Sequence, residues 1–478
     1  MNQYISFIIF LPFLEIITGS FARRYKKFHE IMICLISIVS LIISINIPIS
    51  EELYFIDFGF FKLKFMCDIY SYFFGILINI VWILTNLYSY SYTSLSIHRH
   101  KINEFFRSLS LSIFTVFGIC YSGDLITTFI FSTLLTLITS PLIVQNSTKE
   151  CVVARNWYLI THLGSSFLFF VPAMWLIWYY IGSLDFSHIN SLHLLHNDTI
   201  AGIILFLFIF GISKNCIIPF HNWIIKATVA PTPVSGLLHS VAAVKSGSII
   251  MLKIVVYVFG TEYTQHLTSN FLTGGWIFYV CGITALYAAW MAWKTKVVKH
   301  RFAYSTISQL SYILSSFLIA TPLAITAGTL HIISHSICKI VLFYIAGIYS
   351  AVYGIHSTSD AAKLAPHIKF WIACLGFCGA SIIGFPLLPG SFGKDYMIIA
   401  DWKTHHYASI FFLIVGSVIN ILYIYPIVKA GFFTKNPVPV QKKRIPLTMQ
   451  IAIILGVCIA ICMSIFIHYI INFFNMYV

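Results

Sequence analysis

The chain has 478 residues, of which 59% are hydrophobic and only 9% are charged. A soluble domain usually carries about 25% charged residues, so this composition excludes a water-soluble globular protein and indicates one embedded in a bilayer. The formal net charge of +14 raises the question of nucleic-acid binding, but no loop is long enough to form a domain that holds a duplex, so no nucleic-acid partner is expected.

Apolar runs recur along the whole chain. Residues 31–49 and 449–473 are examples, and crossing a hydrocarbon core takes roughly 20 residues per helix. Breaks at polar or Pro-containing stretches divide the chain into about 14 such segments. They leave no room for a separate soluble domain. The sequence therefore predicts an all-α integral membrane protein in which residues 1–478 form a single polytopic domain.

The first apolar run, residues 5–17, carries Glu15. It lacks both a basic region before it and a small-residue cleavage site, which are the marks of a signal peptide. We therefore predict that it is a retained membrane helix.

The positive charges are distributed unevenly when the loops are assigned alternately to two sides. Most of the 29 Lys and Arg residues fall on one side, among them Arg23, Lys299, Arg301, Lys435 and Lys442. The other side receives only Lys62, Lys64 and Lys403. By the positive-inside rule the basic side is cytoplasmic, and both termini lie outside the cytoplasm. The expected location is the bacterial inner membrane.

Five lysines remain within the apolar runs: Lys214, Lys245, Lys253, Lys339 and Lys394. A charged group near the bilayer centre costs about 2.5–3.5 kcal/mol on insertion scales, so such residues usually face a protein interior or a water-filled path. Buried lysine releases its proton far more readily than arginine, which suits a proton relay. Lys253 is equally compatible with snorkelling from a helix end.

Three histidines lie in the same runs: His239, His331 and His335. His331, His335 and Lys339 are spaced four residues apart, which places them on one helical face. A metal or haem site, a structural hydrogen-bonded pair and a proton relay are the three interpretations. No Cys-rich cluster or neighbouring Glu supplies further ligands, and imidazole titrates near neutral pH. A relay is therefore favoured, and no metal or cofactor is expected.

Two segments carry helix-breaking residues at membrane depth. Residues 214–223 contain Pro219, and residues 384–395 contain Pro386 and Pro389. Pro frees backbone carbonyls, which a membrane tolerates only where neighbours or water satisfy them. Paired broken segments in two halves of a transporter mark an ion path. A kink that merely helps packing is the alternative for each.

Several motifs together resemble the proton-conducting subunits shared by Mrp-type multisubunit cation/proton antiporters and by respiratory complex I, where they are chains L, M and N. The matching runs are Ser122-Gly-Asp124-Leu-Ile-Thr, Ala230-Pro231-Thr-Pro233-Val-Ser-Gly-Leu-Leu-His239, Tyr304-Ser-Thr-Ile-Ser-Gln309-Leu-Ser-Tyr312, His331-Ile-Ile-Ser-His335-Ser-Ile-Cys-Lys339 and the stretch from Gly384 to Asp395. They span roughly residues 60–430, the expected antiporter-like core.

The resemblance implies 14 transmembrane helices with two inverted five-helix repeats and broken helices at the seventh and twelfth positions. By motif position, Lys214 is the lysine of the seventh helix, and Lys245 or His239 is the relay of the eighth. His331, His335 and Lys339 form the connecting set of the eleventh helix, and Lys394 is the terminal lysine of the twelfth. The Pro-Thr-Pro-Val-Ser run is similar to the D-type subunits of Mrp antiporters and to chain L relatives. The short stretch after the last apolar run implies that the long lateral helix of chain L is lacking, which favours an Mrp-like D subunit or a shorter paralogue of chain L.

One position departs from the family pattern. After the Gly-Asp-Leu run the family carries a glutamate, and this chain has Thr133 there. In the family that Glu pairs with the seventh-helix lysine, and an opposite charge favours the protonated amine. Either another acid such as Asp124 or Asp68 replaces it, or coupling is weakened or lost.

The leading hypothesis is a proton-translocating subunit of an Mrp-type Na⁺/proton antiporter, working with other membrane subunits. The alternatives are a proton-pumping subunit of an NADH-quinone oxidoreductase and a scaffold subunit that no longer conducts. The chain itself is expected to hold no redox centre, because it lacks a dinucleotide-binding fingerprint and cysteine clusters.

Overall fold

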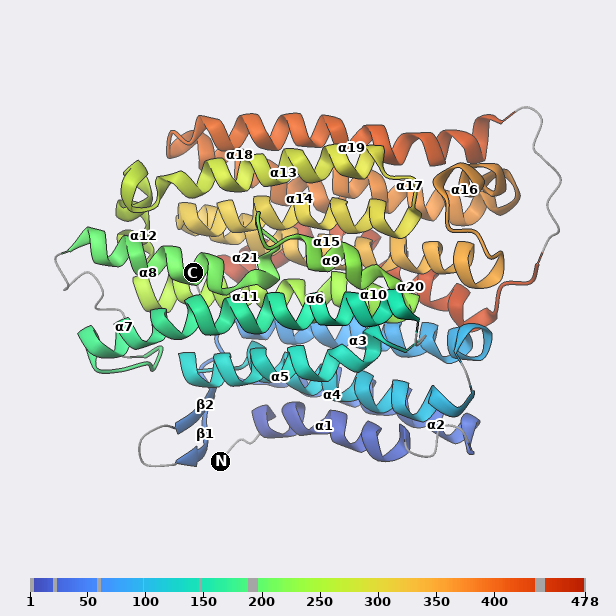
Figure 1. The fold of residues 1–478 in the computed structure, drawn as a ribbon, viewed down its shortest axis with the longest axis horizontal. Helices are drawn as coiled ribbons and strands as arrows, with labels where there is room; N and C mark the ends of the chain where they lie inside the picture. Colours follow the sequence, from blue (N-terminus) through green and yellow to red (C-terminus); the bar gives the residue numbers. More distant parts are fainter. Residues whose placement is uncertain are drawn as a thin grey trace.

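The computed structural model describes residues 4–19, 24–57, 62–97, 99–145, 148–187, 197–434 and 443–476. Arg23, Lys435 and Lys442, assigned above to the basic side, lie outside these residues. The described chain is a bundle of helices running side by side (Figure 1). This follows from the composition, because a backbone in lipid must satisfy its hydrogen bonds within the segment.

The N-terminal part contains five helices. They are α1 (Tyr4–Gly19), α2 (Lys26–Asn46), α3 (Ile69–Ser96), α4 (Ile102–Cys120) and α5 (Leu125–Ile143). Two of these helices begin directly after an aspartate that the sequence section names. The Asp68 carboxylate accepts a hydrogen bond from the Ser71 N–H of α3, and the Asp124 carboxylate accepts one from the Thr127 N–H of α5, both at 2.6 Å. Such N-caps satisfy donors that a helix start leaves free.

A β-hairpin connects α2 to α3. Its strands, β1 (Glu52–Asp57) and β2 (Lys62–Met66), pair antiparallel and lie at the ends of the helices, at the lower left of Figure 1. The sequence Lys62-Leu-Lys64-Phe alternates polar and apolar residues. Lys64 and Phe65 are nevertheless both buried, so β2 is covered on both faces at that point. We predicted only a loop here, so the hairpin is an addition to the all-α prediction.

The middle of the chain is built from shorter helices. They are α6 (Lys149–Ser165), α7 (Val171–Ile181), α8 (Asp198–Gly211), α9 (Asn222–Lys226), α10 (Thr232–Leu237) and α11 (Val244–Lys253). π-helical turns, Ser166–Phe170 and Leu238–Ala242, join α6 to α7 and lie between α10 and α11.

The remaining helices complete the bundle. They are α12 (Thr261–Ser269), α13 (Trp276–Lys294), α14 (Val298–Ile319), α15 (Pro322–Gly347), α16 (Thr358–Leu364), α17 (Lys369–Ile383), α18 (Pro389–Lys403), α19 (Tyr407–Phe433), α20 (Leu447–Ile465) and α21 (Ile467–Asn475).

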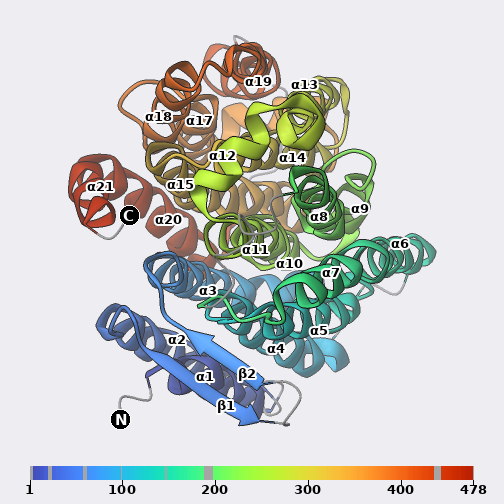
Figure 2. The same cartoon turned by 90° about the vertical axis from the view of Figure 1, so that its left-hand side faces the viewer.

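Ten helical segments in the described residues are long and apolar enough to cross a membrane. The multi-pass, helical membrane fold is therefore confirmed, whereas the count of 14 and the inverted repeats stay predictions. In the segment Pro322–Val352, which contains α15, 94% of the residues in its 18-residue apolar window are buried. The corresponding share is 33% for the spans of α2, α19 and α20. Seen from the end, α15 and α10 lie in the interior and α1, α2 and α19 at the periphery (Figure 2). Helix α15 thus forms the centre of the core.

Candidate functional site

Both Pro-containing segments interrupt helices. Helix α8 ends at Gly211, a 3₁₀ turn Ser213–Asn215 follows, and α9 begins only at Asn222. Helix α17 ends before Gly384, whose φ of +98° favours glycine. Helix α18 then begins at Pro389. The sequence predicts both breaks, and Pro219 and Pro386 lie exposed within them. Each break places a lysine in the interior: Lys214 in the first and Lys394 beside the second.

The Lys214 side chain is buried against α5. Its Nζ atom donates to the carbonyl oxygen of Ser132 at 3.1 Å, to the Ser132 Oγ at 3.0 Å and to the Thr136 Oγ1 at 3.0 Å. The hydroxyl of Thr133 is buried and has no hydrogen-bond partner in the described chain. The oxygens at the amine are therefore those of Ser132 and Thr136, on either side of the position that departs from the family pattern.

Neither acid considered as a replacement pairs with Lys214. The Asp124 carboxylate accepts bonds from Thr127 and from the backbone N–H of Lys64. The Asp68 carboxylate caps α3 and lies 3.8 Å from the Lys253 Nζ atom. Among the described residues, no carboxylate lies within 4.0 Å of the Lys214 amine.

Lys253 is not a snorkelling residue. Its side chain is 1% exposed, and its Nζ atom donates to the carbonyl oxygens of Cys120 and Ser122, both at 2.7 Å. These carbonyls lie at the C-terminal end of α4, where helices leave acceptors free. Lys253 therefore joins the end of α11 to the end of α4, and the snorkelling interpretation is wrong.

The central contact of the site joins α11 to α15. The Lys245 Nζ atom is hydrogen-bonded to Nδ1 of His335, and both side chains are buried. The rings of His335 and His331 are 6.1 Å apart, and His331 Nε2 bonds to Oε1 of Gln309 on α14 at 3.0 Å. The structure therefore brings together residues 90 positions apart in the chain.

Lys394 adjoins this group through a close helix contact. A Cβ atom on Gly393 would lie 2.8 Å from the Cβ of His331, so α18 approaches α15 as only glycine permits. The Lys394 Nζ atom donates to the Ile383 carbonyl at 3.0 Å and to the Ser417 Oγ at 2.9 Å. The first of these bonds satisfies a carbonyl that the break frees. Asp395, predicted as a supporting residue, is exposed and forms no ion pair with Lys394.

Two predicted residues flank the centre. Lys339 donates from Nζ to the carbonyl of Phe302 on α14 at 2.9 Å. The His239 ring stacks on Phe343 at 4.4 Å, and neither of its nitrogens has a partner in the described chain. Pro231 and Pro233 are buried at the start of α10, and the π-helical turn that follows this helix contains His239. In the described residues, no three His, Cys, Asp or Glu side chains converge to hold a metal ion.

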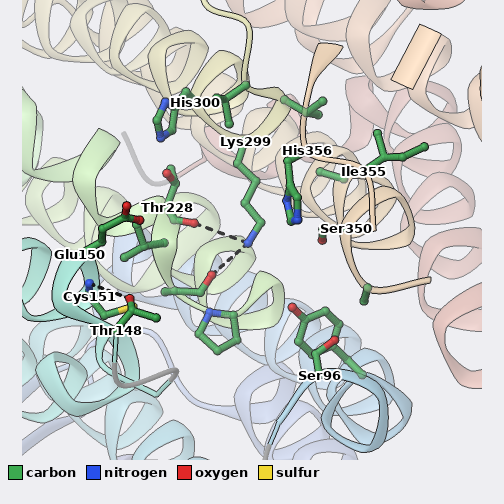
Figure 3. A pocket seen from close by; sticks show the side chains of 18 residues that line it. Ser96, Thr148, Glu150, Cys151, Thr228, Lys299, His300, Ser350, Ile355 and His356 are labelled. Carbon is green, nitrogen blue, oxygen red and sulfur yellow. Dashed lines mark hydrogen bonds between the residues drawn. The ribbon is translucent and has the colours of Figure 1, made fainter. Parts of the chain in front are cut away.

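A cavity of about 580 Å³ opens near the first turn of α14 (Figure 3). Lys299 extends into it, and its Nζ atom donates to the carbonyl oxygens of Ala230 at 3.0 Å and Thr228 at 3.5 Å. Glu150, His300 and His356 also line it. Lys299 is near enough to His239 for its charge to act on that ring.

Lys299 and Arg301, predicted from sequence to lie in a basic loop, instead lie in the first turn of α14. Arg301 is 8% exposed, and its guanidinium donates to the carbonyls of Tyr423, Trp293 and Thr295. Lys299 could have been found by its spacing, because residues 299, 302, 306 and 309 repeat at helical intervals and place it on the same face as Gln309. Assigning every Lys and Arg near a helix end to a loop hid this helical spacing.

Comparison with known proteins identifies similar chains. The family described as NADH:quinone oxidoreductase/Mrp antiporter, TM matches residues 122–420. The A/B subunit of a probable K(+)/H(+) antiporter of Rhizobium meliloti (strain 1021) is 28% identical over 71% of this chain and 33% of its own length. NADH-ubiquinone oxidoreductase chain 5 of Schizophyllum commune is 24% identical over 97% of this chain and 71% of its own. This chain thus spans about a third of the first relative.

Two solved structures share the fold. One chain of the archaeal membrane-bound sulfane sulfur reductase superposes with a TM-score of 0.83 at 20% identity, covering 99% of this chain and 96% of that one. One chain of the Mrp complex from Dietzia sp. DQ12-45-1b superposes with a TM-score of 0.82 at 15% identity and the same coverage.

Proposed function

Because this chain belongs to the NADH:quinone oxidoreductase/Mrp antiporter membrane family, we propose that it relays protons through its buried lysines and histidines as one subunit of a multisubunit membrane complex. The observation that carries the proposal is the buried bond between Lys245 and His335, with Lys214 and Lys394 at the helix breaks on either side.

The spatial order of the groups supports a relay. Gly247 lets α11 approach Lys214 closely, since a Cβ atom there would lie 2.8 Å from the Lys214 Cβ. From Lys245 the series continues to His335 and His331, and His331 is near enough to Lys394 for their charges to interact. The proposed order is therefore Lys214, Lys245, His335, His331 and Lys394.

The bonding of these groups suits proton exchange. Lys214 and Lys394 bond only neutral oxygens in the described chain, so no hydrogen-bonded ion pair holds their protons. The Asp395 carboxylate acts on Lys394 only through its charge. Nδ1 of His331 and Nε2 of His335 are buried without a protein partner there. Buried polar atoms normally bond protein or water, so these nitrogens are positions where a water molecule can bond and pass a proton.

The cavity at Lys299 supports uptake from the predicted cytoplasmic side. It is large enough for several waters, since one water occupies about 30 Å³ in the liquid. Lys299 lines this cavity, and its charge acts on His239, as do the charges of Lys339 and Lys245. We therefore assign Lys299 the role of the first proton acceptor.

The finer proposal is an Mrp-type protein that exchanges protons for Na⁺, with the motif resemblance favouring the D type. Lys214→Ala and Lys394→Ala should abolish Na⁺-driven proton movement in everted membrane vesicles that hold the assembled complex. The exposed Lys369→Ala variant is the matched control and should transport normally.

A conservative substitution separates proton relay from simple charge. Arginine keeps the positive charge but does not release its proton. Lys394→Arg should therefore be as inactive as Lys394→Ala, at unchanged protein level in the membrane. Normal transport by both Ala variants would refute the relay. Normal transport by the Arg variant would show that Lys394 contributes only its positive charge and does not release a proton.

A second candidate is a proton-pumping subunit of a respiratory complex. The alignment with the fungal chain 5, which covers 97% of this chain, favours it. Mass spectrometry of the complex purified from native membranes in mild detergent decides between the two. Small hydrophobic antiporter subunits would support the antiporter, whereas flavin and iron-sulfur subunits would support the redox pump.

A further inference from the structure

A second group of buried polar side chains lies in α1 to α4, on the side of the molecule away from α14, α15 and α18 (Figure 2). At its centre is Glu15 of α1, which is fully buried. Its Oε2 atom accepts a hydrogen bond from the indole Nε1 of Trp82 at 2.8 Å. With the Asn86 amide turned so that its nitrogen donates, Oε1 accepts a second bond at 3.2 Å. Ser110 of α4 supplies a hydroxyl. An ionisable residue inside a membrane span is costly and therefore calls for a function.

Helix α3 extends this polar group along the bundle. Asn79, Trp82, Asn86 and Ser89 recur at intervals of three or four residues, so they share one face of α3, and all four are fully buried. The Asn79 Nδ2 atom donates to the Ser44 Oγ of α2 at 2.7 Å. Polar side chains of this kind join membrane helices through hydrogen bonds. An ionisable side chain such as Glu15 is not needed for that purpose and is costly in a membrane.

His29 of α2 is linked to the Glu15 site through α4. The centre of its ring lies 4.6 Å from the centre of the Phe106 ring. Phe106 and Ser110 lie on consecutive turns of α4. His29 is 1% exposed, and neither ring nitrogen has a partner in the described chain. His29 lies near the start of α2 and Glu15 near the end of α1, so both lie toward the predicted cytoplasmic end of the bundle.

The groups around Glu15 select a proton as the ligand. On α2, Cys34 is within electrostatic range of both Glu15 and Glu30, while Trp82 and Asn86 of α3 and Ser110 of α4 are neutral. In the described chain no Lys or Arg pairs with Glu15. A hard cation needs several oxygen ligands, whereas two of the three neighbours direct N–H groups at the carboxylate. A proton needs only one oxygen.

We propose that Glu15 is a proton-binding site separate from the lysine and histidine relay, and that His29 connects it to the predicted cytoplasmic end. Neither His29 nitrogen bonds the carboxylate, so the transfer step uses a bridging water. The N–H bond of the His29 imidazolium breaks as its proton passes to the water, the water gives one of its own protons to Glu15 to form an O–H bond, and both side chains become neutral. The site goes beyond the proposed function and does not depend on it.

Infrared difference spectroscopy of the full chain in lipid nanodiscs after pH steps tests the site. A protonated carboxyl gives a C=O stretching band that a carboxylate lacks. We expect a titrating band that is lost in Glu15→Gln. The band should persist in Lys394→Ala and in Asp401→Asn, which removes another buried carboxyl. A band unchanged in Glu15→Gln would overturn the proposal.

Two further variants guard against a merely structural effect. Trp82→Phe removes the indole donor and should shift the frequency of the Glu15 band without abolishing it. His29→Ala should slow the rise of that band after a pH step while leaving its final amplitude unchanged. An unshifted band in Trp82→Phe, or an unchanged rate in His29→Ala, would contradict the assigned site or the assigned route.

Discussion

The Nζ atom of Lys214 lies 3.0 Å from the Oγ atom of Ser132, one residue before the position where the antiporter family carries a glutamate. The amine is thus held by hydroxyl and carbonyl oxygens and, in the described chain, by no charged group. Lys214 therefore keeps its place at the helix break without the ion pair that the family uses to hold its proton.

Restoring a negative charge at this amine tests whether coupling is weakened. Ser132→Asp places a carboxylate where a hydroxyl now bonds Lys214, and an opposite charge favours the protonated amine. We expect faster Na⁺-driven proton exchange in vesicles, whereas Ser132→Asn, which has the same shape without the charge, should behave like the unmodified chain. Equal rates in all three proteins would show that the missing carboxylate does not limit coupling.

The close contact between α15 and α18 should not tolerate a methyl group. Gly393→Ala places a Cβ atom 2.8 Å from the His331 Cβ and 3.0 Å from its backbone nitrogen. Overpacking of this kind costs about 1–3 kcal/mol, so the melting temperature in detergent should fall and proton transport should be lost.

Gly164 of α6 offers the matched control. No atom lies within 4 Å of a Cβ built there, and alanine is favoured over glycine in a helix by about 1 kcal/mol. Gly164→Ala should therefore keep or raise the melting temperature. A stable, active Gly393→Ala protein would mean that the two helices are farther apart than described.

The hairpin should be held to the bundle by a pH-dependent ion pair. The Lys64 side chain is 2% exposed, and its Nζ atom lies 3.1 Å from Oδ1 of Asp185. Burial opposes the charged form of Asp185, but hydrogen bonds from Ser187 and Lys64 outweigh it and lower the pKa of that carboxyl below its ordinary value. Burial likewise opposes the charge on Lys64, and Asp185 and Glu52 together raise the pKa of its amine.

The signs of these shifts define the pH window. A lowered carboxyl pKa stabilises the fold above the unfolded value of about 4 and is lost as the pH falls through the folded value. A raised lysine pKa stabilises below about 10 and is lost as the pH rises further. Asp185→Asn should therefore weaken hairpin docking by about 1 kcal/mol or more at neutral pH, and much less in acid. Hydrogen exchange of the β1 and β2 amides measures this, and an equal effect at both pH values would contradict it.

The membrane orientation predicted from charge is open to cysteine labelling. Lys363 and Lys403 are both exposed, at α16 and at the end of α18, which lie toward opposite ends of the bundle in Figure 1. In a background with Cys458 and Cys462 replaced by serine, an impermeant thiol reagent applied outside intact cells should label Lys403→Cys and not Lys363→Cys. The reverse pattern would invert the topology.

Local pattern was sufficient to find Lys214 and Lys394. Each is a lysine within an apolar run beside a proline, and both the cost of a buried charge and the loss of helical hydrogen bonds at proline depend on neighbours in sequence. The same reasoning left snorkelling open for Lys253, and it failed for Lys299, which it placed in an exposed loop. In both cases other segments of the bundle supply carbonyl acceptors to the amine.

The sequence by itself determined that this is a helical membrane protein with two broken segments and a polar face at residues 331, 335 and 339, because hydrophobicity and helical period act over a few neighbouring residues. Only the tertiary structure decided that Lys245 meets His335, that Ser132 and Thr136 hold Lys214, and that Trp82 bonds Glu15. These contacts join residues 67 to 90 positions apart, and they depend on how whole helices pack, which no local pattern encodes.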